Sequence, residues 1–197
     1  MKTIFLILIL ALAINSNAQL LIDDFSSGEL STTNFSETDT ELFQSGRNIV
    51  GNNRELKVHI GNKEDGQNVQ AAIKNNKLIS SFGYNTSGVL KINYGRAPGG
   101  KKPLNLDASS YSDLRIEFEA KSSKSHFYVS LFTNNSRAVW NSHLIGREGS
   151  YLLKVPLSEL KVVDDGFTLN DIDQIRFQFN SSSITGHNFA IKKIWFQ

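Results

Sequence analysis

The sequence predicts an all-β fold, a two-sheet antiparallel β-sandwich, from two observations. Short segments with alternating apolar and polar residues recur about every 8–12 residues, separated by Gly, Asn and Asp, which is typical of sandwiches and barrels. Apolar residues do not follow the helical period of 3.6 over any segment longer than about ten residues, so helices are minor. Strands with a single apolar face bury it when two sheets pack together.

The centre of the predicted sandwich is the segment 114–132, which contains two amphipathic strands around a polar turn. Because successive strand side chains point to opposite faces, each strand has an inward and an outward set. With those of a later strand at 172–180, the predicted inward residues are Leu114, Ile116, Phe118, Phe127, Val129, Leu131, Ile175, Phe177 and Phe179. We expect the first two strands to be neighbours in the middle of one sheet.

The other predicted strands are shorter and lie on both sides of this segment. In chain order they are residues 20–25, 46–51, 54–60, 69–73, 78–82, 89–94, 138–145, 151–155 and 189–196. Asn75-Asn76 is a hairpin signal between two of them. Residues 26–45 are expected to form a long loop with at most one edge strand, 95–102 a Gly/Pro-rich loop, and 156–160 one helical turn.

Residues 1–18 are predicted to be a secretory signal peptide. Lys2 gives a positive start, residues 4–14 form an uninterrupted apolar run, and Ala18 ends a short stretch of small and polar residues. The run is short for a membrane span, although an uncleaved anchor is the alternative. We therefore expect export to the bacterial periplasm or medium, with no membrane span and with residues 19–197 as a single β-sandwich domain.

The signal peptide should be cleaved between Ala18 and Gln19, after the small residue that export peptidases require. Intact-mass measurement of the exported protein is expected to give a chain that begins at Gln19. A mass that still includes residues 1–18 would contradict the prediction.

Composition excludes several classes of function. The chain has 21 Lys and Arg, 19 Asp and Glu, and a formal net charge of +2 at pH 7, so its overall charge suggests no nucleic-acid partner. Cysteine is absent, which excludes disulfides, thiolate nucleophiles and Cys-ligated metals. The four histidines lie on different segments without the spacing of a metal site.

Several stretches resemble the galactose-binding-like jelly-roll domains, which include carbohydrate-binding modules and related bacterial secreted proteins. The stretches that carry this resemblance are Ile22 to Phe25, Leu104 to Tyr111, Tyr151 to Leu157 and Ile172 to Phe177. Residues 46–56 are similar to a Gly-Gly-x-Arg stretch of such secreted proteins. The resemblance implies a jelly-roll form of the sandwich, and it implies an activity much less directly because the motifs are structural.

The same resemblance raises the question of a calcium ion, which many of these modules hold with an acidic residue on their last strand. Here Lys192 and Lys193 stand on that strand, while Asp23 and Asp24 remain near the N-terminus. Calcium takes six to eight oxygen ligands, several of them carboxylate. We therefore predict no metal or other cofactor, with Asp23 and Asp24 as turn-capping residues.

Paired carboxylates are the one arrangement that could suggest hydrolysis. Glu117 and Glu119 lie two apart on one strand face, as in some jelly-roll glycosidases, but Phe118 stands where the retaining enzymes carry an acidic residue. Arg115 and Arg176 are available to neutralise the pair, so we predict a solvated or ion-paired face and no enzyme.

The outward side chains of the central sheet are the candidate ligand site. Sugars bind to aromatic planes and to planar polar groups that contact their hydroxyls. The candidates are Arg115, Glu117, Tyr128, Trp140, Arg176 and Gln178, with Ser130, Phe132 and Asn180 beside them. The sequence thus predicts a secreted, noncatalytic module that binds a glycan on one sheet face. Two alternatives are a structural or adhesive protein that contacts other proteins, and an ordinary solvent-facing sheet.

Overall fold

The computed structural model describes residues 19–33, 39–62, 69–121, 124–181 and 186–197. The predicted signal peptide at 1–18 lies outside the described residues. Among those residues, no helix is long and apolar enough to cross a membrane.

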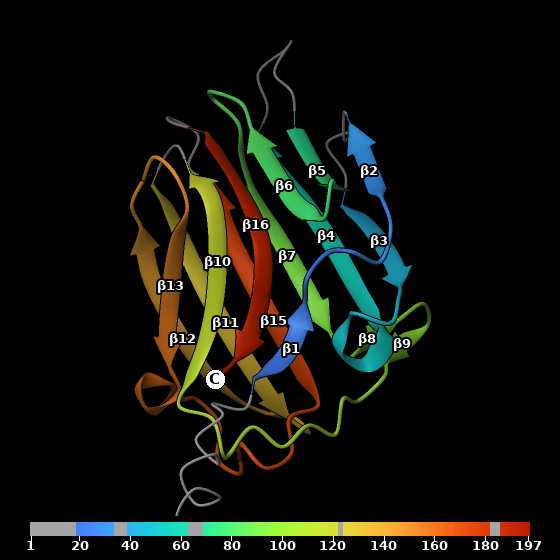
Figure 1. Cartoon of the computed structure of the whole chain (residues 1–197), viewed down its shortest axis with the longest axis vertical. Helices are drawn as coiled ribbons and strands as arrows, with labels where there is room; N and C mark the ends of the chain where they lie inside the picture. The colour runs from blue at the N-terminus through green and yellow to red at the C-terminus, as the bar shows by residue number, and fades with distance from the viewer. Residues whose placement is uncertain (1–18, 34–38, 63–68, 122–123, 182–185) are drawn as a thin grey trace, which may run out of the picture.

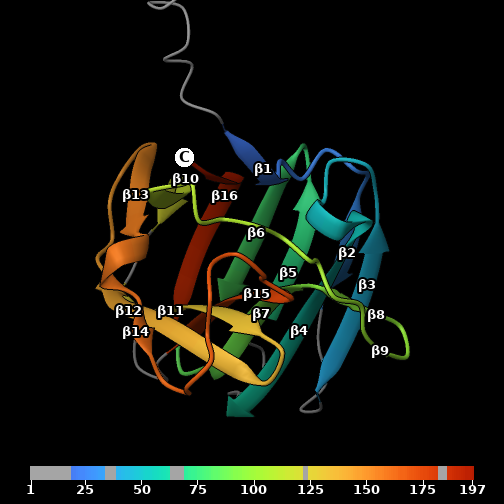
Figure 2. The same cartoon turned by 90° about the horizontal axis from the view of Figure 1, so that it is seen from below.

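Two large antiparallel sheets face each other, as Figures 1 and 2 show. Sheet A contains, from edge to edge, β13 (Tyr151–Pro156), β10 (Asp113–Lys121), β16 (His187–Phe196), β6 (Lys77–Phe82), β5 (Val69–Lys74) and β2 (Leu30–Thr33), and β1 (Leu20–Asp23) also pairs with β16. Sheet B contains β14 (Lys161–Val162), β12 (Ser136–Leu144), β11 (Ser125–Thr133), β15 (Gln174–Ser181), β7 (Ser87–Tyr94), β4 (Asn53–Asn62) and β3 (Thr40–Ser45). The predicted two-sheet antiparallel sandwich is confirmed.

The prediction that the two central strands are neighbours is wrong. β10 lies in sheet A, between β13 and β16, whereas β11 lies in sheet B, between β12 and β15. A hairpin within one sheet and a crossing between two sheets leave the same pattern of one apolar face per strand, so alternation alone does not distinguish them. The chain therefore passes from sheet A to sheet B between β10 and β11, and the outer faces of these two strands lie on opposite sides of the molecule.

Local structure agrees with most of the other predictions. The hairpin at Asn75-Asn76 is confirmed, and both residues have the positive φ, 52° and 55°, of the turn type that matches strand twist. The described part of residues 26–45, which leaves out 34–38, carries two edge strands instead of at most one, β2 in sheet A and β3 in sheet B. The strand predicted at 46–51 is wrong, because residues there form a turn and the short 3-10 helix η1 (Val50–Asn52). The loop at 95–102 contains the small hairpin of β8 (Arg96–Ala97) and β9 (Gly100–Lys101), and the helical turn η2 (Leu157–Glu159) is confirmed.

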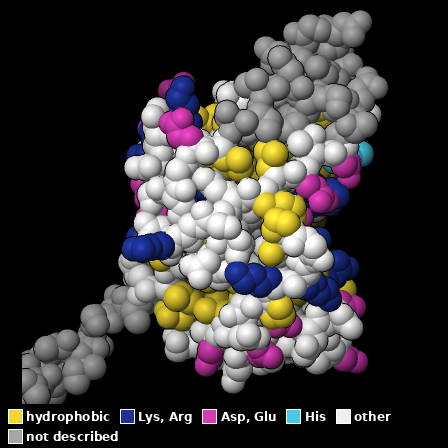
Figure 3. Space-filling model, turned by 90° about the vertical axis from the view of Figure 1, so that its right-hand side faces the viewer, with side chains coloured by type: hydrophobic (Ala, Val, Ile, Leu, Met, Phe, Trp, Pro, Cys, Tyr) yellow, Lys and Arg dark blue, Asp and Glu magenta, His cyan; other side chains and the backbone are white. Residues whose placement is uncertain are grey.

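The core lies between the two sheets and is rich in phenylalanine. All nine predicted inward residues are fully buried. Phe118 of sheet A stacks on Tyr151 with ring centroids 4.9 Å apart, and its ring meets the edge of Phe179 of sheet B at 6.4 Å. The contact between Phe118 and Phe179 connects the two sheets, so the outer faces rest on a closely packed layer. Figure 3 views the edge formed by β2 and β3, where small hydrophobic patches lie among charged side chains.

Candidate functional site

The outer face of sheet B presents polar side chains in rows across the strands. One row centres on Tyr128 of β11, which pairs with Asn141 of β12 and Gln178 of β15. Gln178 in turn pairs with Lys91 of β7, which extends the row toward β4. Because side chains in register on one face lie within about 5.5 Å at Cβ, these groups can contact one ligand together.

The next row across the same face is more strongly cationic. Ser130 of β11 lies between Val139 of β12 and Arg176 of β15, and Val139 pairs with Lys161 of β14. Arg176 pairs with Asn93 on its other side. This row places a small hydroxyl and an apolar side chain between two cations.

The two rows form a shallow hollow of about 400 Å³, which we call the sheet B groove. It is lined by Tyr128, Ser130, Arg137, Val139, Asn141, Lys161, Val163, Arg176 and Gln178. A volume of this size falls within the range of small-molecule sites, roughly 300–1,000 Å³. Its lining combines one aromatic ring and two valines with hydrogen-bonding groups, which suits a ligand that has both C–H faces and hydroxyls.

Arg176 is held in place by neighbours on both sides. Its Nε donates to Asn93 Oδ1 at 2.7 Å, and its guanidinium lies 5.1 Å from the centroid of the Phe132 ring. Asn93 Nδ2 donates to Glu55 Oε2 at 2.6 Å, and Arg96 Nε lies 3.2 Å from that same oxygen. The network therefore contains two guanidinium groups and a single carboxylate, and it fixes Arg176 at the floor of the groove.

Positive charge on this face is incompletely balanced. Burial lowers the pKa of Arg176, and the charge of Arg96 lowers it further. Burial, followed by the charges of Arg176 and Lys57, likewise lowers the pKa of Lys91. Both shifts mean that an added negative charge here would be favourable, because it would stabilise the charged forms of these groups.

Two smaller hollows continue the same face at either end. One of about 170 Å³ is lined by Gly95, Lys101, Pro103, Phe132, Asn134, Asn135, Asp173 and Gln174. Gly95 has a φ of +87°, and a Cβ there would come within 2.1 Å of the Asp173 carbonyl oxygen, so a side chain would disturb this end. The other hollow, of about 360 Å³, lies at the opposite end and is lined in part by His126 of β11 and His143 of β12. These two residues are directly opposite each other, with ring centroids 3.8 Å apart.

Three of the six predicted site residues come together in the groove, and two are on the wrong side of the molecule. Tyr128, Arg176 and Gln178 share the sheet B groove. Arg115 and Glu117 lie on the outer face of sheet A, since β10 belongs to that sheet. Arg115 Nη2 donates to Asp113 Oδ2 at 3.1 Å, and the Glu117 carboxylate lies 4.0 Å from Lys192 Nζ. They cannot contact a ligand that occupies the groove.

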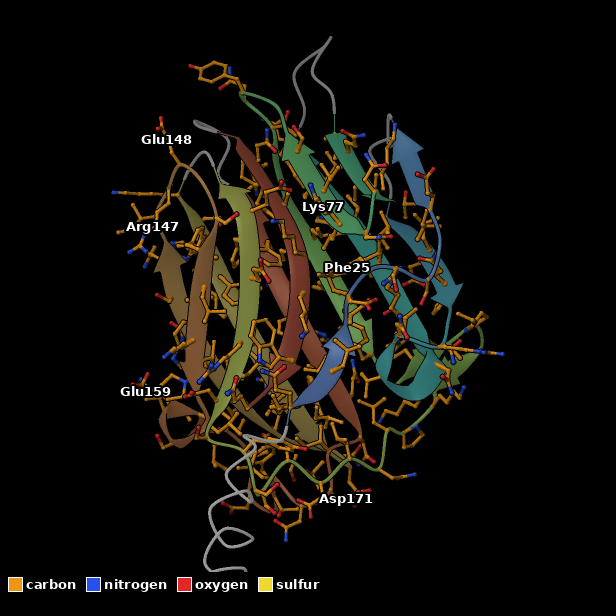
Figure 4. All side chains as sticks on the ribbon, in the orientation of Figure 1. Phe25, Lys77, Arg147, Glu148, Glu159 and Asp171 are labelled. Atoms are coloured by element: carbon orange, nitrogen blue, oxygen red, sulfur yellow. The ribbon has the colours of Figure 1, made fainter. Side chains whose placement is uncertain are left out.

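Trp140, the sixth predicted residue, faces between the sheets at the edge of sheet B. It pairs with Val129, whose side chain is in the core, and its ring lies 6.3 Å from that of Phe127. Its Nε1 donates to Glu159 Oε2 at 3.1 Å; Glu159 is labelled in Figure 4. The prediction that Trp140 lies on the outward face with Tyr128 is wrong. On β12 the side chains of Ala138, Trp140 and Leu144 point toward the core side of the sheet.

One carboxylate of the pair on sheet A, Glu119, is held in an ion pair. Glu119 Oε2 lies 2.5 Å from Lys77 Nζ, and this hydrogen bond lowers the pKa of Glu119. Lys77 is labelled in Figure 4, on the sheet A side. A general acid needs a raised pKa, so the shift of Glu119 is in the opposite direction. The predicted ion pairing is confirmed for Glu119, but its partner is Lys77, whereas the sequence suggested Arg115 or Arg176.

Asp23 is the centre of a fully buried polar cluster between β1, β4 and β7. Its carboxylate accepts hydrogen bonds from Arg54 Nη1 at 2.6 and 2.7 Å, from Tyr94 OH at 2.9 Å and from the Phe25 amide at 2.8 Å. Asp23 and Arg54 are both 0% exposed. Burial raises the pKa of Asp23, and the charge of Arg54 opposes that shift.

These contacts do not fit a calcium ion at Asp23 and Asp24. The lone pairs of the Asp23 carboxylate are taken by four donor contacts, and the arginine supplies the positive charge. The Asp24 carboxylate accepts from the Ser26 amide and from Asn48 Nδ2. Within residues 19–33, 39–62, 69–121, 124–181 and 186–197, no group of three or more His, Asp or Glu side chains could hold a metal ion.

Sequence reasoning missed several residues of the groove. Val139 and Asn141 lie on the outward phase of β12, which the alternation of that strand could have shown. Lys161 and Val163 come from the segment after η2, which pairs with β12 over only two residues. That pairing is too short to leave an alternating pattern, so the sequence contains no signal for it.

Comparison with known proteins finds similarity only at the level of solved structures. No protein-family model and no curated protein matches the chain. A family 11 carbohydrate-binding module from Clostridium thermocellum, solved with a β-1,3-1,4-mixed-linked tetrasaccharide, is 13% identical, with 90% of this chain and 94% of that chain covered and a TM-score of 0.43. A family 29 carbohydrate-binding module is 11% identical, with 81% and 90% covered and a TM-score of 0.38.

An agarase structure is similar to nearly the whole chain. It is 10% identical, covers 92% of this chain and 24% of its own, and has a TM-score of 0.51. The chain thus corresponds to about a quarter of that enzyme and shares the fold of that part. Together with the two sheets, this similarity confirms the two-sheet jelly-roll sandwich that the sequence predicted.

Proposed function

We propose that the chain is an exported, noncatalytic glycan-binding module, and that it holds a sugar chain in the sheet B groove. The observation that supports this most is the convergence of Tyr128, Arg176 and Gln178, from two neighbouring strands, on one hollow. The Tyr128 ring and the valines can cover the C–H face of a sugar, while Arg176, Gln178 and Asn141 contact hydroxyls. The sheet fixes these groups before a ligand arrives, which limits the entropy lost on binding.

The groove gives this proposal a direct test. Replacement of Tyr128 by Ala should weaken binding by about tenfold or more, since truncated aromatic anchors typically cost more than 1 kcal/mol. The melting temperature should stay nearly unchanged, because the Tyr128 side chain is outside the core and part-exposed. A glycan array on residues 19–197 would identify the ligand, and titration calorimetry would give the dissociation constants.

Tyr84→Ala is the matched control for this test. Tyr84 is 61% exposed and lies between β6 and β7, away from the groove lining, so its loss should leave binding unchanged. Equal losses for Tyr84→Ala and Tyr128→Ala, or an unaltered dissociation constant for Tyr128→Ala, would contradict a site in the groove.

A structural or adhesive role is the second candidate, and exposed apolar side chains at the β12–β13 edge favour it. Ile145 is 63% exposed and Leu152 is 41% exposed, and both line a hollow beside that edge. Under this alternative no glycan binds, and Ile145→Asp with Leu152→Asp abolishes self-association or capture of a protein partner. Sedimentation analysis of the purified domain separates the two candidates.

A further inference from the structure

The unbalanced cations of sheet B give the groove a chemical preference that its shape alone does not. Of the described residues that line it, Arg137, Lys161 and Arg176 are basic and none is acidic. Lys91 extends the set, because it pairs with Gln178 at the rim. The overall charge of +2 does not indicate this cluster of cations, because acidic side chains elsewhere in the chain offset their charge.

Few of these cations have a carboxylate partner. The ion pairs formed among the described residues include neither Lys91, Lys161 nor Arg176. Arg137 lies 3.6 Å from Asp164, a long contact between two exposed side chains. Paired cations occur on both outer faces, for example Lys77 and Lys192 on sheet A and Lys57 on sheet B. Lys91, Lys161 and Arg176 are distinguished by lying close together in and beside one hollow without such a partner.

An unpaired cation on a half-buried sheet face is costly unless a ligand supplies the anion. Arg176 is fixed by Asn93 and Phe132, so its Nη atoms are oriented before binding. A guanidinium binds carboxylate or sulfate with two parallel hydrogen bonds, and each such charge-assisted bond is stronger than a bond to a neutral hydroxyl. Lys91 and Lys161 lie on either side of Arg176, across the direction of the strands.

We propose that the sheet B groove selects acidic polysaccharides, with Arg176 at the centre and Lys91 and Lys161 at the two sides contacting carboxylate or sulfate groups. The inference rests on the proposed function and specifies its substrate class. The sugar ring is then covered by Val139, Val163 and Tyr128, and the cations bind its acidic groups.

Two matched pairs of probes test the preference. Polygalacturonic acid is compared with its methyl ester, and dextran sulfate with dextran, so that charge changes while each backbone stays the same. We expect at least tenfold tighter binding to a charged member than to its neutral counterpart. That difference should shrink as sodium chloride rises, because salt screens exposed charges. A preference for polygalacturonic acid alone identifies carboxylate as the group, and one for dextran sulfate alone identifies sulfate.

Charge-removing variants assign the effect to the groove. Lys161→Gln and Lys91→Gln should each weaken binding of the charged probe by about three- to fivefold, the range of a single exposed ion pair. Lys91→Gln should keep its melting temperature, because burial and neighbouring cations already disfavour the charged lysine. Lys154→Gln, an exposed lysine on β13 of sheet A, is the matched control and should bind like the unaltered protein.

The outcomes separate this inference from the proposed function. Tyr128-dependent binding of neutral glycans, with no gain for the charged members, overturns the acidic preference and leaves a glycan module. An equal loss in Lys154→Gln overturns the inference too, because it shows attraction by net charge without a site. Binding to none of the four probes, nor to any glycan on the array, overturns both.

Discussion

Replacement of Arg54 by Met is expected to destabilise the protein by about 3–5 kcal/mol, the cost of leaving one charge of a buried pair without its partner. Arg54 and Asp23 are both fully buried, and Arg54 Nη1 contacts both carboxylate oxygens of Asp23. The guanidinium also lies 5.2 Å from the centroid of the Phe25 ring, a residue labelled in Figure 4, so its removal also takes away packing. Urea unfolding followed by circular dichroism measures the loss.

The effect of pH identifies the lost charge as the cause. Burial raises the pKa of Asp23, and Arg54 opposes this shift, so the variant should raise that pKa further. A carboxyl whose folded pKa is raised stabilises the fold below its unfolded pKa and loses this stabilisation as pH rises through the folded pKa. The deficit of Arg54→Met relative to the unaltered protein should therefore be smaller near ~pH 4 than at pH 7.

Two further variants complete this test. Asp24→Asn changes a carboxylate whose contacts with Ser26 and Asn48 are exposed, so it should cost no more than about 1 kcal/mol. Asp23→Leu combined with Arg54→Met removes both charges and should cost less than the sum of the single changes. Additive losses, or a deficit for Arg54→Met that does not depend on pH, would contradict a coupled pair.

The alternating pattern predicted the faces of the strands well. Leu56, Val58 and Ile60 of β4 are buried, and Arg54 occupies the same phase two residues earlier. The inward position of Arg54 was thus available from the sequence. Its partner was not, because Asp23 is 31 residues away and no local rule pairs β1 with β4.

The assignment of strands to sheets could not be predicted in the same way. Because β10 and β11 belong to different sheets, the predicted site residues lie on two opposite faces of the molecule. Alternation shows which residues of a strand share a face, but it does not show which strands are neighbours. The predicted grouping of Tyr128, Arg176 and Gln178 is correct because β11 and β15 do pair. The predicted presence of Arg115 and Glu117 in the same site requires β10 to pair with β11, whereas β10 pairs with β13 and β16.

The groove also depends on irregular segments that carry no periodic signal. Lys161 and Val163 follow a 3-10 turn, and Val163 N donates to the Arg137 carbonyl oxygen at 2.9 Å. This contact places the segment along the free edge of β12. Such short edge pairings are set by the packing of the whole sandwich. The sequence therefore predicts the groove residues on β11 and β15 but not Lys161 and Val163.

Replacement of Phe118 by Ala is expected to cost about 3–5 kcal/mol, as other large-to-small changes in cores do. The Phe118 side chain is 0% exposed and contacts aromatic rings from both sheets, at 4.9 Å from Tyr151, 6.2 Å from Phe189 and 6.4 Å from Phe179. Closely packed rings on three sides cannot collapse into the space, so the change leaves a cavity and removes lateral contacts between the sheets.

Phe43→Ala is the matched control for Phe118→Ala, because Phe43 is a half-buried residue on the outer face of the edge strand β3. The loss in free energy of unfolding caused by Phe43→Ala should be less than about half of the loss caused by Phe118→Ala, since the Phe43 ring is already partly in water. Chemical unfolding of both variants gives the comparison. A loss below about 1 kcal/mol for Phe118→Ala would mean that the ring does not fill the core, and the inward and outward faces of β10 would then have to be exchanged.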